Sequence, residues 1–288
     1  MSVATTASTV TLPAPTLAPT RPVSRTTAFA ALSRRRVALS AHTPRELLVP
    51  LVTPILFADV IAPALAKTMG VFRGIDYVSF VAVGTIGLLV PLACVLGGVG
   101  MIVDRQSGSQ RDLLAAPIPR SLLVLGNLSV ALVVSALQVA ALFAASVLRG
   151  ADFHVTASGV LWAGAAVLAL AIAMHGVAEV LASKLKTQEE YIGAAPPIAL
   201  VPWFFAGSFF PISAMPAGLT VFAKVLPLTH ALAVLRYALV DGKATGLHDI
   251  WGMSNVTAMA ALSLTVVVAF AGLMTAAGIR AFTRSAIS

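Results

Sequence analysis

The sequence predicts an all-α membrane protein that crosses the bilayer six times. Hydrophobic residues make up 58% of its 288 residues and charged residues 10%, far below the roughly 25% charged content of soluble domains. The mean hydropathy is +0.95. Five uncharged stretches of 26 to 33 residues, and a sixth of 20 residues with one Asp, can each cross a hydrocarbon core of about 30 Å as a helix. A water-soluble fold could not bury so much apolar surface.

The chain begins with residues 1–27, which are rich in Thr, Ala, Pro and Ser. They contain no apolar run of the kind found in a signal peptide. We therefore expect a disordered cytoplasmic tail, followed by one membrane domain over residues 28–288.

Three consecutive arginines, residues 34–36, lie beside Phe29, Leu32 and Val37. This pattern predicts a short helix on the membrane surface, attracted to anionic lipid by about 1 kcal/mol per basic residue. The net charge of +8 could also indicate a nucleic-acid-binding surface. We attribute it to the cytoplasmic side of a membrane protein and expect no nucleic-acid partner.

The six predicted spans follow in order. The first contains Asp59, whose insertion cost of about 2.5–3.5 kcal/mol its Leu, Val and Ile neighbours can offset. The fifth contains Pro196, Pro197 and Pro202, which should bend or loosen it because each removes a backbone donor. The predicted spans are residues 47–66, 77–103, 121–148, 153–178, 191–223 and 250–279.

The distribution of Lys and Arg predicts the orientation of these spans. With the N terminus inside, 13 of the 19 basic residues fall on the cytoplasmic side, as the positive-inside rule requires. Both termini are then cytoplasmic and the protein is multi-pass. Tyr191 falls at an inner span end, where we expect its ring in the headgroup layer.

Two connecting segments give information about local structure as well as about topology. In the loop at residues 104–120, alternating charges surround Gly108, a helix-competent piece follows, and Pro117 and Pro119 precede the third span. By composition alone this is also compatible with an ordinary solvated loop. The outer segment at residues 209–236 is too apolar for a solvated loop and too rich in proline for one spanning helix. It predicts short, half-inserted re-entrant helices packed on the protein after the fifth span.

In order and position, these two segments resemble the permease subunit of type-2 ABC exporters, particularly the daunorubicin-resistance group, over about residues 34–284. The resemblance implies that the loop forms a cytoplasmic coupling helix docking on a separate ATPase, and that the outer segment forms an extracellular gate. Gln106 and Ser107 stand where the family often has an acidic residue. The loop residues concerned are Asp104, Arg105, Gly108, Arg111, Asp112, Leu113, Leu114, Pro117 and Arg120; the outer pattern comprises Phe210, Pro211, Ile212, Ser213, Pro216, Leu226, Pro227 and Arg236.

The chain contains no Gly-x-x-x-x-Gly-Lys-Ser/Thr motif, the loop that holds ATP phosphates. The resemblance accordingly implies that ATP and Mg bind a nucleotide-binding ATPase subunit and that this chain binds no cofactor. It also implies a homodimer or heterodimer of permeases. We expect the protein in the plasma (inner) membrane, and the alanine-rich, lysine-poor composition suggests a bacterial source. The expected activity is export of a hydrophobic drug, antibiotic or lipid-like compound. We predict a transport subunit and not an enzyme.

Ionisable residues inside spans are further candidates, because such groups usually face a bundle interior or water. Asp59 lies in the first span, and His175 and Glu179 share one face of the fourth. They could line a transport pathway or carry protons. Alternatively, neighbouring groups neutralise Asp59, and Glu179 meets Lys184 or water. The single cysteine, Cys94, is expected to be an apolar core residue.

Three other functions remain as alternatives. The first is export of a lipid-linked glycan, which the aromatic residues would serve equally well. The second is a proton-coupled secondary transporter centred on Asp59, His175 and Glu179. The third is an intramembrane enzyme, which the five scattered histidines disfavour because they show no His-Glu-x-x-His spacing and suggest no metal site.

Overall fold

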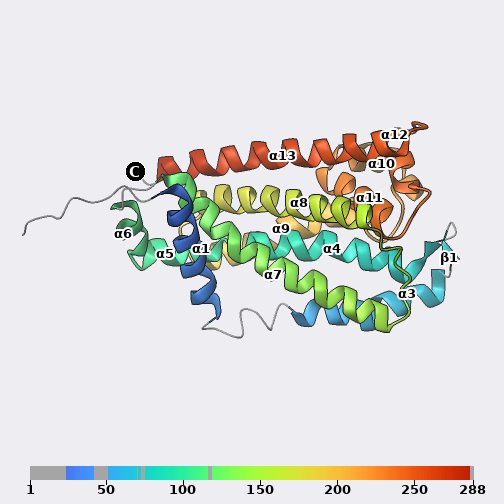
Figure 1. The fold of residues 1–288 in the computed structure, drawn as a ribbon, viewed down its shortest axis with the longest axis horizontal. Helices are drawn as coiled ribbons and strands as arrows, with labels where there is room; N and C mark the ends of the chain where they lie inside the picture. Colours follow the sequence, from blue (N-terminus) through green and yellow to red (C-terminus); the bar gives the residue numbers. More distant parts are fainter. Residues whose placement is uncertain (1–23, 42–50, 70, 73–74, 116–118, 286–288) are drawn as a thin grey trace, which may run out of the picture.

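The computed structural model describes residues 24–41, 51–69, 71–72, 75–115 and 119–285, and most of them are helical. The long helices lie side by side along one direction, and helix α1 lies across them at one end (Figure 1). The long axis is built by α4 (Tyr77–Leu96), α5 (Val99–Gln106), α7 (Arg120–Leu148), α8 (Ala157–Lys184), α9 (Gln188–Phe205) and α13 (Val256–Ser285).

The two ends of the bundle differ. We call one the α6 end; it holds α1 (Arg25–Ala41), α5, α6 (Ser109–Ala115) and the last turns of α8 and α13. The other, the α11 end, holds a short hairpin and four short helices. These are β1 (Val71–Phe72), β2 (Ile75–Asp76), η2 (Ile212–Ala214), α10 (Ala217–Val225), α11 (Pro227–Leu239) and α12 (Thr245–Trp251).

Helix α1 begins at Arg25, three residues before the boundary at residue 28 that the composition suggests. It packs against α7. Residues 1–23 of the predicted tail lie outside the described residues.

Among the described residues, fewer helices could cross a membrane than the six spans that the sequence predicts. Within the described part of the chain, four helices are long and apolar enough to cross a membrane. Helices α10 and α11 meet at 84°, a geometry typical of a broken span or a re-entrant loop, and counting the pair as one span gives five. The first of the four is α4 continued by α5, Tyr77–Gln106. The other three lie in α7, α8 and α13 and cover Arg120–Leu148, Ala157–Lys184 and Val256–Arg284.

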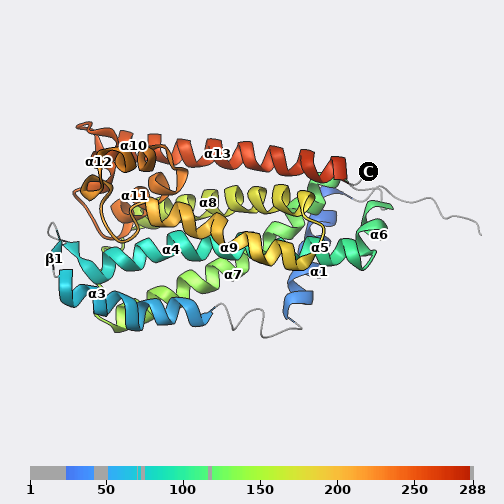
Figure 2. The same cartoon turned by 180° about the vertical axis from the view of Figure 1, so that it is seen from behind.

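Two predicted spans, the first and the fifth, are absent from this count. Residues 47–50 of the first lie outside the described residues; its described part is helical from residue 51 to Met69 and includes η1 (Phe57–Ile61), a π-helical stretch, and α3 (Ala62–Met69). The fifth corresponds to α9, which has 18 residues and begins with Gln188, Glu189 and Glu190. Helix α9 nevertheless continues through its three prolines and packs along α4 (Figure 2).

The packing of α8 against α13 forms one wall of the bundle. It depends on Gly176, where an added Cβ would lie 2.5 Å from the carbonyl carbon of Met274 and 2.7 Å from the amide nitrogen of Thr275. Atoms do not approach so closely without overlap, so the two backbones can touch only because no side chain intervenes.

Candidate functional site

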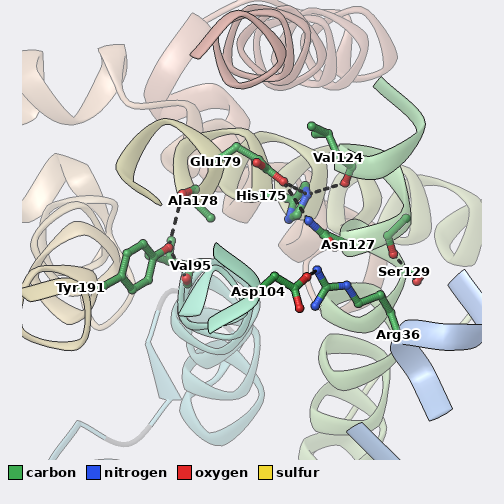
Figure 3. Close-up of polar contacts among 11 residues, drawn as sticks. Arg36, Val95, Asp104, Val124, Asn127, Ser129, His175, Ala178, Glu179 and Tyr191 are labelled. Carbon is green, nitrogen blue, oxygen red and sulfur yellow. Dashed lines mark hydrogen bonds and ion pairs between the residues drawn. The ribbon is translucent and has the colours of Figure 1, made fainter. Parts of the chain in front are cut away.

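The α6 end is organised around an ion pair between α1 and α5. The guanidinium of Arg36 donates to the carboxylate of Asp104 (Figure 3). Both side chains are largely buried. Burial lowers the pKa of the Arg36 guanidinium, and the charge of Asp104 opposes this shift. The pair therefore ties the helix that crosses the bundle to the start of the predicted coupling loop.

Breaking this pair should destabilise the α6 end measurably. Asp104→Asn leaves the buried Arg36 charge unpaired, so we expect a loss of about 1.5–3 kcal/mol in the free energy of unfolding. The exchanged pair Arg36→Asp with Asp104→Arg should recover more than half of that loss. Unfolding in mixed detergent micelles measures both values. Arg34→Asp, at an exposed position, is the control; an exchanged pair no better than the single variants would contradict the assignment.

Arg105 is also engaged within the chain. Its guanidinium donates to the carbonyl oxygens of Ala182 at 3.0 Å and Leu185 at 2.5 Å, at the C-terminal end of α8. A cation there satisfies carbonyls that have no partner within the helix and complements the helix dipole. Arg105 therefore links α5 to α8 within the chain, whether or not it also contacts a partner protein.

The structure describes the positions of some of the other loop residues but not of all of them. Gly108 separates α5 from α6 with φ +80°, a conformation that glycine adopts without strain. Leu113 packs with Leu123 and Phe282. Arg120 donates to the carbonyl oxygen of Thr283 at 3.2 Å. The side chains of Arg111, Asp112 and Leu114, and all of Pro117, lie outside the described residues.

A buried polar cluster lies next to this ion pair, between α7 and α8. Glu179 is 1% exposed. Its Oε1 accepts from Asn127 Nδ2 at 3.4 Å and lies 3.4 Å from His175 Nε2. His175 Nε2 also lies 3.0 Å from the carbonyl oxygen of Val124. Figure 3 shows these side chains converging in the space between the two helices.

Asp59, the third predicted pathway residue, lies elsewhere. Its carboxylate accepts from Arg149 Nε at 2.8 Å, and the side chains are 36% and 50% exposed. Arg149 follows the last residue of α7, whereas His175 contacts Val124 near its start. The 25 intervening residue steps correspond to about 37 Å along the helix. The structure therefore joins His175 and Glu179 but does not bring Asp59 to them.

At the α11 end, Arg236 is 7% exposed. One of its terminal nitrogens donates to the carbonyl oxygens of Gly207 at 2.9 Å and Ser208 at 3.1 Å. Its guanidinium carbon lies 3.6 Å from the centre of the Phe80 ring, a cation–π contact. Arg236 thus fixes the backbone after α9 to α11 and α4.

The remaining predicted gate residues shape the same end. Phe210 is exposed and its ring lies 6.4 Å from that of Phe209. Pro211 and Pro216 immediately precede η2 and α10, and Pro227 is the first residue of α11. Proline suits such helix starts because its fixed φ and missing N–H cost nothing there.

Three residues with structural roles at these sites were not predicted to have them. Asn127 carries no motif. Trp203 is buried and donates from Nε1 to the carbonyl oxygen of Gly84 at 2.7 Å. Tyr191 is 0% exposed and donates to the carbonyl oxygen of Val95 at 2.6 Å, so its expected place in the headgroup layer is wrong. Buried Trp and Tyr need a partner for their polar group, and this is the signal that the sequence offers.

Comparison with known proteins gives one family. Residues 27–240 match the family described as ABC-2 type transporter. This range contains most of α1, the charged loop, the polar cluster and Arg236. No curated protein matches the chain.

Proposed function

Because the chain belongs to the ABC-2 type transporter family, a family of membrane permeases, we propose that it is the six-span permease subunit of an ATP-driven exporter. This proposal is supported by the family match together with the contacts that hold the α6 end together. There, Arg36 joins α1 to α5, Arg105 joins α5 to the end of α8, and Arg120 joins the start of α7 to the end of α13. Leu113 of α6 packs with Leu123 of α7 and Phe282 of α13. A force applied to α6 would therefore reach several long helices.

The α6 end is proposed to face the cytoplasm and to dock on the ATPase subunit. It carries Arg34, Arg35, Arg36, Arg105 and Arg120, and the C-terminal end of α13 lies beside it. This concentration of arginine agrees with the positive-inside rule. The turn at residues 106–108, in which Gln106 and Ser107 are exposed, connects α5 to α6 and is the proposed contact with the partner.

The α11 end is then extracellular, with α10 and α11 as a re-entrant pair and Phe210, Pro211, Pro216, Pro227 and Arg236 forming the gate. The exporter is proposed to contain two permease subunits and two ATPase subunits that hold ATP and Mg, in a bacterial inner membrane. Its cargo is proposed to be a hydrophobic drug, antibiotic or lipid-like compound, as in the daunorubicin-resistance group.

Gentle purification of the tagged chain from its native membrane tests the proposal. We expect a nucleotide-binding protein to co-purify in about a 1:1 ratio, as two subunits of each kind imply, with ATPase activity. Gly108→Val should reduce its recovery, because a β-branched residue at φ +80° costs about 1–3 kcal/mol of backbone strain in the turn.

The matched control is Gly193→Val on α9, where an added Cβ meets no atom within 4 Å and φ is not positive. It should recover the partner as the unmodified chain does. A chain that purifies without any nucleotide-binding protein would contradict the exporter proposal. Equal recovery with both variants would instead contradict the assignment of the turn.

A further inference from the structure

A small pocket lies at the α6 end between α1, α5, α6 and α7. Its volume is about 20 Å³, which exceeds the roughly 10–15 Å³ that one water needs. The pocket is partly open, so it can hold one oxygen atom of a larger ligand that extends beyond it. The lining combines apolar side chains with hydrogen-bonding ones. The polar side chains are Arg35, Arg36, Asp104, Gln110 and Asn127, and the apolar ones include Leu32, Met101, Leu113 and Phe282.

Several hydrogen-bond donors in this pocket are not used by the protein. Within the described part of the chain, neither Arg35 nor Gln110 takes part in a hydrogen bond or an ion pair. Asn127 Nδ2 carries two hydrogens, and its contact with Glu179 Oε1 at 3.4 Å uses one of them. Arg35, Gln110 and Asn127 are all only partly buried, so a ligand can reach them. The pocket therefore offers donors from α1, α6 and α7 to a ligand that accepts hydrogen bonds.

The charged side chains of the lining add up to one positive charge. They are the guanidiniums of Arg35 and Arg36 and the carboxylate of Asp104. Asp104 pairs with Arg36 (Figure 3), which leaves Arg35 without a counter-ion among the described residues. Burial lowers the pKa of the Arg36 guanidinium, and the like charge of Arg35 lowers it further. The two cations therefore repel each other, and an anion bound in the pocket would relieve this repulsion.

The position of α1 indicates the source of such an anion. Because α1 lies across the long helices at one end (Figure 1), it lies along the membrane surface when those helices cross the membrane, at the depth of the lipid phosphates. A phosphodiester carries one negative charge, which matches the lining, whereas a phosphate monoester carries about 1.5–2 at pH 7. The carboxylates of Asp104 in the pocket and of Glu179 beside Asn127 disfavour the second charge.

We propose that this pocket binds the phosphodiester group of one anionic phospholipid, with Arg35, Gln110 and Asn127 donating to its oxygens. It is a discrete site for one headgroup, which differs from a general attraction of the arginines at residues 34–36 to an anionic surface. The bound lipid connects α1 to α6 and α7 and so stabilises the α6 end. The inference rests on the part of the proposed function in which the long helices cross the membrane, and not on the ATPase subunit or on export.

Lipid binding by variants of two neighbouring arginines tests the site. Native mass spectrometry of the purified full chain in detergent measures the affinity for the first molecule of added phosphatidylglycerol. Arg35→Gln should weaken this binding at least about tenfold, as the loss of a hydrogen bond to a charged group implies. Arg34→Gln removes the same charge from an exposed position one residue away and should change the affinity by about twofold or less. Equal losses in the two variants would indicate general attraction and overturn the site.

A second pair of variants tests the donor from α6. Gln110→Glu replaces the amide donor with a carboxylate and should also weaken phosphatidylglycerol binding at least about tenfold. Gln106→Glu makes the same change at an exposed position outside the pocket and should bind the lipid as the unmodified chain does. Equal affinities of these two variants would contradict the proposal. Arg35→Gln should unfold at the same temperature as the unmodified chain when no lipid is added, because no described contact is lost.

Other probes identify the part of the lipid that is bound. Phosphatidylethanolamine, whose headgroup has no net charge, should bind severalfold more weakly than phosphatidylglycerol, and equal binding would contradict recognition of an anion. Inorganic phosphate should not displace phosphatidylglycerol. If it does, the pocket binds a soluble phosphate and the assignment to a lipid fails. All these measurements use the chain without an ATPase subunit, so their outcome is separate from that of the export proposal.

Discussion

Arg236→Ala is expected to lower the free energy of unfolding by about 3–5 kcal/mol, since it removes two charged hydrogen bonds and most of a buried side chain. The carbonyl oxygens of Gly207 and Ser208 lose their donor, and Phe80 loses a cation at 3.6 Å. The backbone between α9 and η2 would then detach from α11. If the α11 end is the gate, transport should fall at least as strongly as stability.

Arg236→Lys tests whether the site requires a guanidinium group or only a positive charge. Lysine keeps the charge but lacks the planar group that can bridge two successive carbonyls and stack on a ring. We expect it to recover less than half of the loss. Lys224→Ala, on α10 at the same end, is the control and should change stability by no more than about 0.5 kcal/mol. A lysine variant as stable as the unmodified protein would contradict the proposed bridge.

Gly176→Ala is expected to destabilise the protein by about 1–3 kcal/mol or more, as overpacking of a closely packed contact does. The added methyl group would lie 2.5 Å from the Met274 carbonyl carbon. Because backbone atoms cannot turn aside as a flexible side chain can, α8 and α13 must separate. Thermal unfolding of the detergent-solubilised chain measures the effect.

Gly164 offers the same substitution in the same helix with the opposite expectation. An added Cβ there meets no atom within 4 Å, and alanine is the better helix former by about 1 kcal/mol or less. Gly164→Ala should therefore be neutral or slightly stabilising. If both alanine variants lose stability equally, the loss comes from helix α8 itself and not from its contact with α13.

The helices that the sequence predicts best are those for which hydropathy alone decides. The uncharged stretch at residues 121–148 corresponds to α7, Arg120–Leu148, and the stretch at residues 250–279 to most of α13. The fourth span is displaced: it is predicted at residues 153–178, whereas α8 covers Ala157–Lys184. The N-cap Thr156 sets its start. Its end lies beyond Glu179 because this charged residue is buried inside the bundle.

The sites are predicted less completely because the sequence does not show which partner a polar group will meet. Arg105 belongs to a loop predicted to dock on another protein, yet its guanidinium binds carbonyls of α8 about 80 residues away. From their positions in predicted spans, Asp59 and His175 are both candidate pathway residues. Only the packing of α7 places one against Arg149 at its end and the other against Val124 near its start.

The backbone of the α11 end is held by hydrogen bonds from side-chain donors to main-chain carbonyl oxygens. Tyr77 donates to the carbonyl oxygen of Phe209, as Arg236 does to that of Ser208. Every amino acid supplies a carbonyl, but few supply a phenol or a guanidinium. A substitution at an accepting position such as Phe209 therefore leaves the acceptor of the bond in place. The side chains on the surface of the α11 end can therefore change while the same donors hold its backbone.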